Sequence, residues 1–370
     1  MPKGLRLLVL TKYGRLGASS RLRALQYLPW FELSGVSCVV SSLLSDRQVH
    51  SLYDGGRYPL GGLFFSYFRR MCVLLTSRKF DVVWIEKEAF PWLPVWFERV
   101  LLYGVPYILD YDDAIFHNYD LHRRAWIRLR FGRRIDRLMA RAHLVIGGNN
   151  YLAQRARDAG SAWVEVVPTV IDLNRYTPKP ECSILSGAVP RIVWIGSPST
   201  VRYLDVLREP LQALSLTLPF TLLVIGGGEV VIPGVNVESR PWSELTEMDC
   251  IRGCDVGVMP LLNSPWESGK CGYKLIQYMA CSLPVVASAV GANTDIVRDG
   301  IDGYLACNSD EWVMALSELL SNAALRVQMG RAGRLRVEQH YCLQQTAPRL
   351  IAMLQDTAAN RSAKAIAGTE

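Results

Sequence analysis

Short apolar runs alternate with segments of helical length along the whole chain, and this alternation constrains the fold more than any other feature. The runs in the first half include LRLLVL, DVVWIE and PYILDY, and those in the second half include RIVWIG, TLLVIGG and PVVASAV. Runs that are apolar on both faces are typical of parallel strands covered by helices on both sides. The pattern therefore predicts an α/β chain with two doubly wound parallel sheets.

The chain is long enough for two such domains, because 370 residues exceed the size at which single cores usually stop growing. A segment rich in Pro and Ser, residues 168–190, separates the two sets of runs. We expect Rossmann-like domains over residues 1–172 and 188–340 that face a central cleft, where ligands bind beyond the carboxyl ends of the strands. Residues 341–370 should form a C-terminal helix and tail.

The charge is unevenly distributed along the chain. Residues 1–180 hold 26 Lys and Arg against 15 Asp and Glu, a net charge of +11, and residues 181–370 hold 15 against 19, a net charge of −4. A basic first half favours an acidic partner, either nucleic acid or an anionic membrane surface. The arginines alternate with apolar residues and no nucleic-acid module is recognisable, so we expect no nucleic acid among the partners.

The same composition argues against export and against a metal site. No uncharged apolar run reaches the roughly 18 residues of a membrane span, and the apolar run near the N-terminus is too short for a signal peptide. The nine cysteines and five histidines are scattered without the spacing of metal ligands. We expect a cytoplasmic protein with no metal and no cofactor.

Loops after several predicted strands carry residues suited to binding anions or sugars. Glycine lets a ligand approach the backbone, and serine before a helix can present free N–H groups to an anion. Plain turns, capped helices and, for the tryptophan, simple packing explain the same residues equally well. The candidates for binding such a ligand, which we take to be the donor substrate named below, are Gly17, Ser19, Gly196, Ser197, Gly226 and Trp242.

Three acidic residues crowd the end of the run PYILDY. Asp110, Asp112 and Asp113 stand within four positions, where their carboxylates would repel one another. Helix capping or ion pairs with nearby arginines would explain them. Alternatively, Asp112 or Asp113 contacts a sugar hydroxyl or the reacting centre, and the residues alone leave both interpretations open.

Two lysines stand at the start of a helix predicted over residues 271–281. Lys270 and Lys274 lie on one side of it, where they oppose the helix dipole and are slightly unfavourable for stability. A bound diphosphate would make the arrangement favourable, because it would accept hydrogen bonds from the helix N–H groups and from both ammonium groups. We interpret Lys270, Gly272, Tyr273 and Lys274 as a diphosphate site, with solvated surface lysines as the alternative.

The segment KLIQYMACSLPVVASAVGANTDIVRDGIDGYLA resembles the most diagnostic part of the retaining, family 4-like (group 1) glycosyltransferases of the GT-B fold. VVPTVIDLNRYTP resembles their interdomain segment, and ASSRLRALQYLPWFELSGVSCVV resembles their first loop and helix. The resemblance implies two Rossmann-like domains, a UDP- or GDP-sugar donor held mainly by the second domain, and transfer with retention. It also implies a final helix that crosses back to the first domain.

The chain departs from this family at several positions. Two glutamates usually stand eight positions apart around the late helix, and here those positions hold Gly269 and Gln277. Gln277 could still bind a ribose hydroxyl, and Glu267 is a nearby candidate for holding the donor sugar. The usual Arg and Lys after the first strand of the second domain are missing, so Lys270 or, less convincingly, Arg202 would supply that charge.

The expected chemistry follows from the charge that develops when the sugar–diphosphate bond breaks. Lys270, Lys274 and the neighbouring N–H groups would stabilise the leaving diphosphate without a metal. In a front-face displacement that retains configuration, the leaving phosphate itself can take the acceptor proton. Asp112 or Asp113 would then orient donor or acceptor.

The basic first half suggests the acceptor. The segment LHRRAWIRLRFGRRIDRLMARAH places Arg130, Arg134, Arg137 and Arg141 on one helical stripe, beside an apolar stripe. Together with the nearby segment YPLGGLFFSYFRRM, which is rich in aromatic residues and holds two arginines, such a helix suits docking on anionic lipid. The alternative is a core helix with a solvated outer face. We therefore expect a glycan or lipid-linked acceptor in cell-surface polysaccharide assembly, with peripheral attachment to the inner face of the cell membrane as an option.

Three rival functions stay open at this point. A sugar-binding protein without catalysis shares the architecture, although an exported one needs a signal sequence. A degenerate homologue acting as a partner subunit would explain the missing glutamates. A nucleotide-sugar epimerase would react with the donor alone, without an acceptor.

Overall fold

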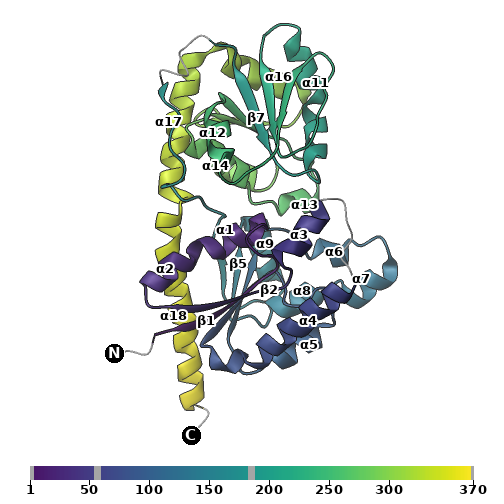
Figure 1. Cartoon of the computed structure of the whole chain (residues 1–370), viewed down its shortest axis with the longest axis vertical. Helices are drawn as coiled ribbons and strands as arrows, with labels where there is room; N and C mark the ends of the chain where they lie inside the picture. Colours follow the sequence, from purple (N-terminus) through teal and green to yellow (C-terminus); the bar gives the residue numbers. More distant parts are fainter. Residues whose placement is uncertain (1–3, 54–59, 182–187, 368–370) are drawn as a thin grey trace. The chain divides into compact units, whose positions relative to one another are not determined.

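The computed structural model describes residues 4–53, 60–181 and 188–367 (Figure 1). They form two compact units: the described residues up to 169 and from 346 onward form unit 1, and those between 170 and 345 form unit 2. Among the described residues, no helix has both the length and the apolar character needed to cross a membrane.

Unit 1 is built on a six-stranded sheet in which every neighbouring pair is parallel. In sheet order, the strands are β2 (Ser37–Ser42), β1 (Arg6–Thr11), β3 (Val82–Glu86), β4 (Tyr107–Tyr111), β5 (Leu144–Gly147) and β6 (Val164–Val166). Strands β3, β4 and β5 are buried along their whole length, as expected for strands with helices on both faces.

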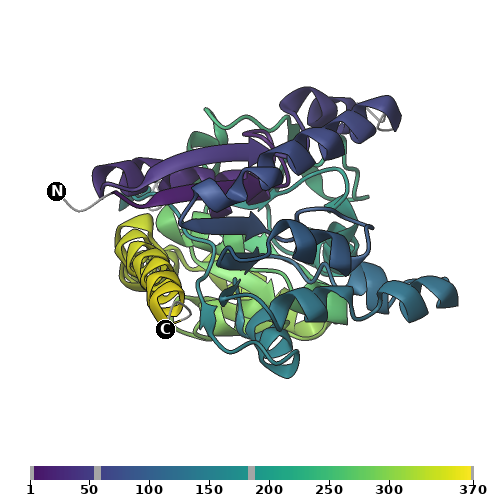
Figure 2. The same cartoon turned by 90° about the horizontal axis from the view of Figure 1, so that it is seen from below.

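The helices of unit 1 connect these strands. They are α1 (Ala18–Arg23), α2 (Leu28–Leu33), α3 (Asp46–Tyr53), α4 (Leu60–Leu75), α5 (Val95–Leu101), α6 (His117–Asp120), α7 (Ala125–Phe131), α8 (Arg134–Met139) and α9 (Asn150–Asp158), with short 3₁₀ turns η1 (Leu25–Tyr27) and η2 (Ser77–Lys79). The long α18 (Leu343–Ala367) begins in unit 2, and its residues from 346 onward belong to unit 1. Within unit 1, α4 and α7 lie on the side away from α18 (Figures 1 and 2).

Unit 2 repeats the design with a second parallel six-stranded sheet. In sheet order, its strands are β12 (Gly303–Ala306), β11 (Val285–Ser288), β10 (Val256–Met259), β7 (Arg191–Ile195), β8 (Thr221–Ile225) and β9 (Asn236–Arg240). Its helices are η3 (Val201–Leu204), α11 (Asp205–Ser215), α12 (Glu247–Arg252), α13 (Pro265–Ser268), α14 (Tyr273–Ala280), α15 (Ala292–Ile296), α16 (Ser309–Ser321) and α17 (Ala323–His340).

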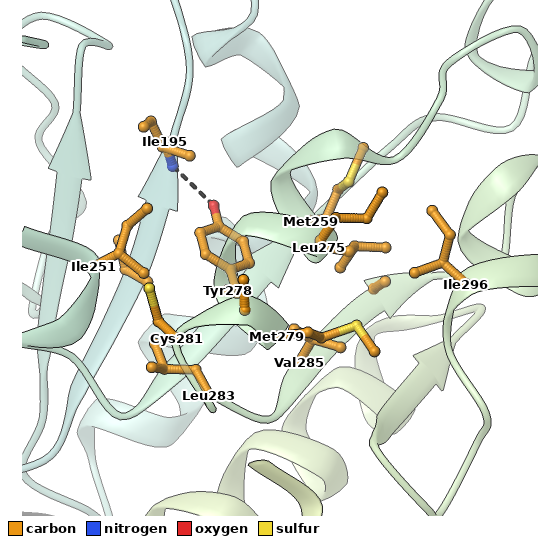
Figure 3. Packing of buried hydrophobic residues seen from close by; sticks show 14 of the residues in the cluster. Ile195, Ile251, Met259, Leu275, Tyr278, Met279, Cys281, Leu283, Val285 and Ile296 are labelled. Carbon is orange, nitrogen blue, oxygen red and sulfur yellow. Dashed lines mark hydrogen bonds between the residues drawn. The ribbon is translucent and has the colours of Figure 1, made fainter. Parts of the chain in front are cut away.

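Successive side chains of the unit 2 strands enter two separate cores. Ile192 and Trp194 of β7 pack with α11 and α16, whereas Val193 and Ile195 pack with α12, α14 and α15. The second core is shown in Figure 3, where the Tyr278 hydroxyl accepts a hydrogen bond from the Ile195 backbone N–H at 3.0 Å. This two-residue period, with apolar residues on both faces, explains why the strands read as continuous apolar runs.

The basic segment between residues 121 and 143 is not the single amphipathic helix that the sequence suggested. The chain interrupts it at Gly132 between α7 and α8. The expected arginine stripe is also wrong at Arg134, which is buried and forms ion pairs with Glu88 and with Glu98, the latter at 2.6 Å. Its apolar neighbours Ile135 and Leu138 lie in the core, so this part of the segment follows the core-helix alternative.

Candidate functional site

The start of α14 is shaped by a glycine in the left-handed region. Gly272 caps the helix with φ of 63°, and a Cβ atom there would lie 2.2 Å from the Ile296 side chain. Glycine is therefore required for both its conformation and its lack of a side chain. Tyr273 is the first residue of the helix, whose first turn holds no acidic residue.

Lys274 is held against an aromatic ring near the end of β7. Its ammonium lies 4.4 Å from the ring centroid of the fully buried Trp194, and that of Lys270 lies 5.6 Å from the ring of Trp266. Among the described residues, no carboxylate pairs with Lys274. Burial, followed by repulsion from Lys270, lowers the pKa of Lys274 to about 7. An anion brought to this point would stabilise the charged form.

Glu267 lies on the short helix α13, and its backbone carbonyl oxygen accepts a hydrogen bond from the Lys270 N–H at 3.0 Å. Its carboxylate accepts hydrogen bonds from the Tyr203 hydroxyl at 2.6 Å and from Ser264, and the Arg202 guanidinium lies 3.9 Å away. Burial alone would raise the pKa of Glu267, but the hydrogen bonds from Ser264 and Tyr203 bring it below its ordinary value. The structure thus brings Glu267 and Arg202 together, with Glu267 held as a carboxylate.

Gln277 and Trp242 take part in a buried polar network. Gln277 is 3% exposed and donates to the Tyr176 hydroxyl at 2.8 Å. Tyr176 and Trp242 each donate to one carboxylate oxygen of Glu247 at 2.7 Å. Glu247 is the central acceptor of this network, and the sequence analysis missed it. Its position in the first turn of α12 is typical of an acidic residue near a helix N-terminus and did not point to a binding role.

Gly196, Ser197 and Gly226 form a tight loop at the ends of β7 and β8. Gly226 has φ of 77°, and a Cβ atom there would lie 2.4 Å from the Gly196 carbonyl oxygen. The Ser197 N–H donates to the Thr200 hydroxyl at 3.0 Å. Internal packing therefore explains both glycines without a ligand.

In unit 1, the two candidate aspartates face a lysine that the sequence analysis missed. Lys87 directly follows β3, and its ammonium lies 2.9 Å from Asp112 and 3.4 Å from Asp113. Burial would lower the pKa of Lys87, but the two carboxylates raise it well above its ordinary value. Burial would raise the pKa of Asp112, but Lys87 and a hydrogen bond from Ser19 lower it to about 2.

Ser19 belongs to a second cluster at the same strand ends. Its hydroxyl donates to Glu86 at 2.7 Å, and Glu86 also accepts from the hydroxyl of Ser20 and from the Lys12 backbone N–H. Gly17 caps α1, and a Cβ atom there would lie 2.3 Å from the Tyr13 side chain. Glu86 ends the run DVVWIE, so the rule that ligands gather at strand ends could have drawn attention to it and to Lys87.

Asp110 is committed to a buried ion pair. It binds the Arg23 guanidinium, with Nε at 3.1 Å, and Arg23 also donates to the Val167 carbonyl oxygen at 2.8 Å. Burial raises the pKa of Asp110 to about 6, against the opposing effect of Arg23. Asp110 therefore has an internal role, which separates it from Asp112 and Asp113.

The described part of the chain holds no cluster of three or more His, Cys, Asp or Glu side chains that could bind a metal ion. The polar side chains at the strand ends instead form hydrogen bonds and ion pairs with one another. What they offer a ligand is hydrogen bonding and charge.

Residues 189–322 match the family model described as glycosyl transferases group 1. The matched residues lie within unit 2 and make up about a third of the chain. The chain is 28% identical over 220 residues to a D-inositol 3-phosphate glycosyltransferase of Salinispora arenicola, which covers 50% of this chain and 47% of that relative. It is 33% identical over 128 residues to the enzyme of the same name from Stackebrandtia nassauensis, covering 34% and 27%. The matches thus span at most about half the length of these relatives.

Solved structures similar to the whole chain confirm the GT-B fold class predicted from the sequence. Sucrose-phosphate synthase from Thermosynechococcus elongatus has a TM-score of 0.72 at 15% identity, covering 96% of this chain and 100% of its own. Anabaena HepE in complex with UDP-glucose has a TM-score of 0.70 at 16% identity, covering 95% and 100%. At these identities the likeness establishes the fold alone and leaves the activity and the substrates of this chain open.

Proposed function

We propose that this chain is a retaining, family 4-like glycosyltransferase that moves a sugar from a nucleotide-diphosphate sugar to a glycan or lipid-linked acceptor. The observation that carries the proposal is Lys274, a partly buried cation at the entrance of α14 without a carboxylate partner among the described residues. A diphosphate would supply a negative partner for Lys274 and would accept hydrogen bonds from the N–H groups at the start of the helix. The match to the group 1 family over the same residues supports this assignment.

Lys274 and Lys270 act on the leaving group in this mechanism. When the bond between the anomeric carbon and the diphosphate breaks, negative charge grows on the phosphate oxygens. Lys274 is protonated as the phosphate approaches, because the opposite charge raises its pKa from about 7. It then stabilises the charge of the transition state together with Lys270 and the N–H groups near Gly272 and Tyr273.

The nucleotide in this proposal is UDP or GDP. A UDP-sugar is favoured, because Anabaena HepE, of similar fold, is described in complex with UDP-glucose. The charge at the diphosphate is supplied by the protein alone, without a metal or an additional cofactor. Glu267 takes the place of the missing family glutamate and accepts hydrogen bonds from the donor sugar hydroxyls. Its pKa, lowered by Ser264 and Tyr203 against the effect of burial, keeps it ionised for that task.

The acceptor proton passes to the leaving phosphate in a front-face displacement, and configuration at the anomeric carbon is retained. Asp112 and Asp113, fixed by Lys87, orient a hydroxyl of the acceptor. The acceptor is a glycan or a lipid-linked molecule of cell-surface polysaccharide assembly. The basic first half of the chain supports this acceptor, because it would attract the protein to the anionic inner face of the cell membrane.

Two experiments test this function. Thermal unfolding of the purified chain with UDP, GDP, ADP and their sugars should show stabilisation by one nucleotide class, because a ligand of the folded state raises the melting temperature. The stabilising sugar nucleotide is then incubated with and without lipid-linked acceptors. Conversion of the donor sugar without an acceptor would identify an epimerase, and binding without any turnover would identify a non-catalytic partner subunit.

A further inference from the structure

Helix α4 exposes three phenylalanines and buries two polar side chains. Phe64, Phe65 and Phe68 are 76%, 63% and 50% exposed. Ser66 and Arg70 on the same helix are 4% and 1% exposed. An exposed stripe of large aromatic residues is unfavourable in water and indicates a surface that meets an apolar partner.

The neighbouring helix α5 continues this character next to a cationic hollow. Trp96, Val100 and the following Tyr103 are all more than half exposed. They line a hollow of about 660 Å³ together with three exposed arginines. These arginines are Arg78, Arg99 and Arg141. Within the described parts of the chain, no carboxylate is paired with any of the three.

The sequence around these helices carries almost no negative charge. Residues 60–80 contain no Asp or Glu, and residues 91–107 contain only Glu98. Glu98 is 1% exposed and is occupied by Arg134. The exposed charge contributed by these two segments is therefore wholly positive, which selects for a partner that is apolar and anionic at once.

We propose that α4 and α5 dock unit 1 onto an anionic membrane surface. The α4–α5 face consists of Phe64, Phe65, Phe68, Leu75, Trp96, Val100 and Tyr103 with Arg69, Arg78, Arg99 and Arg141. Its apolar side chains enter the boundary between headgroups and acyl chains, and the arginines meet lipid phosphates. A second copy of the chain is a poorer occupant, because a two-fold contact would bring the same arginines against one another.

Of the two segments that the sequence suggested for docking, this surface keeps the aromatic one and shares only Arg141 with residues 121–143. In the latter segment Arg134, Ile135 and Leu138 are buried. The inference relies on the proposed function only for the idea of a lipid-linked acceptor. Docking is measured without donor or acceptor, so its failure would leave the transfer reaction untouched, and failure of transfer would leave docking untouched.

Vesicle flotation tests the proposal with the full-length chain. The wild type should float with vesicles of phosphatidylcholine and phosphatidylglycerol at low salt. Phe64→Ser/Phe65→Ser/Phe68→Ser should reduce partition at least about tenfold, because three apolar side chains no longer insert. The matched control, Leu216→Ser/Leu245→Ser, removes two equally exposed leucines of unit 2 and should float like the wild type.

Charge reversal separates the electrostatic contribution to vesicle binding from the contribution of the apolar side chains. Arg99→Glu/Arg141→Glu should weaken binding to the anionic vesicles at least about tenfold and leave binding to pure phosphatidylcholine unchanged, since each basic residue near the surface contributes about fivefold. No flotation of the wild type, equal flotation of the phenylalanine variant and the leucine control, or no effect of charge reversal would each overturn the proposal. A dimer that the phenylalanine variant converts to monomer would also overturn it and assign the face to a second copy.

A native cysteine gives a second readout that leaves the phenylalanines intact. Cys72 is exposed on α4, and Cys307 is exposed in unit 2. An environment-sensitive dye on Cys72, with Cys38, Cys182, Cys250 and Cys307 replaced by Ser, should brighten and shift to the blue on anionic vesicles. The same dye on Cys307, with Cys72 replaced instead, should not change. Equal responses at both positions would contradict docking through α4.

Discussion

Lys87 in unit 1 is buried and Lys274 in unit 2 is partly buried, and their surroundings differ. Lys87 lies between Asp112 and Asp113, which raise its pKa well above the ordinary value. Lys274 meets the ring of Trp194 and the repulsion of Lys270, and its pKa falls to about 7. A cation with carboxylate partners already contributes to the fold, whereas one without them fits the proposed role of binding an anion.

The difference assigns separate tasks to the two places. At the strand ends of unit 1, Lys87 holds the carboxylates of Asp112 and Asp113, and the hydroxyl of Ser19 binds the carboxylate of Glu86. At the entrance of α14, partial burial of the Lys274 ammonium lowers the stability of the fold. Such an unfavourable group is expected where it binds a ligand.

The largest expected effect is on stability in unit 1. Lys87→Met should lower the free energy of unfolding by about 3 kcal/mol, because it leaves the carboxylates of Asp112 and Asp113 without their cation. Lys274→Met should leave the free energy of unfolding unchanged or raise it, since methionine carries no charge to desolvate. Urea unfolding followed by circular dichroism measures both variants. Equal losses in the two variants would abolish the distinction between the lysines.

The second effect concerns transfer. Lys274→Ala should lower the rate of sugar transfer at least about 100-fold, the scale for losing one group that stabilises the charge of the transition state. Arg208→Ala, an exposed change in the same unit, should leave the rate unchanged. Single-turnover measurement at saturating donor separates the rate from binding. A Lys274→Ala enzyme as fast as the wild type would remove Lys274 from the mechanism.

The third effect is a dependence on pH with opposite signs for stability and binding. Lys274 in the folded chain has a pKa of about 7, below the ordinary 10.5, so the unfolded chain binds more protons between these values. The stability of the ligand-free chain should therefore rise with pH above about 7, by up to about 1.4 kcal/mol per pH unit. The affinity for UDP should fall over the same window, by up to about tenfold per unit, because the cation loses its proton.

Urea unfolding and calorimetric titration across this pH range measure the two trends. The Lys274→Met variant is the control, since it should lose the contribution of this residue to both. A wild-type chain that binds UDP equally well at pH values below and above 7 would show that the charge of Lys274 plays no part in nucleotide binding.

The sequence was enough to predict both parallel sheets, because strands buried on two faces leave continuous apolar runs with helical segments between them. It was also enough to place a helix after Lys270, since the period of the apolar residues is local information. It could not reveal that Arg134 is buried, because that depends on Glu88 and Glu98, which lie 46 and 36 positions earlier. Helical spacing alone therefore assigned this arginine to a solvated stripe.

Lys87 was missed for a related reason. Its ammonium reaches Asp112 and Asp113 because β3 and β4 are neighbours in the sheet, and because its backbone adopts φ of 65°, which is uncommon for lysine. Neither fact can be read from the letters EKE. The acidic cluster was visible in the sequence, but the charge that organises it comes from tertiary structure.

The smallest effect is expected at Trp242 in unit 2, which resembles Lys87 in binding carboxylate oxygen from the chain itself. Trp242→Phe removes the hydrogen bond to Glu247 and keeps an aromatic ring. It should lower the free energy of unfolding by about 1 kcal/mol, the usual contribution of one hydrogen bond. The affinity for UDP should stay within about twofold, because Glu247 and its partner Tyr176 are internal. Calorimetric titration of Trp242→Phe and Trp242→Ala with UDP would decide the matter: if both variants bind alike, Trp242 belongs to the fold, and if only the alanine variant loses affinity, its ring stacks on the nucleobase and the network is part of the donor site.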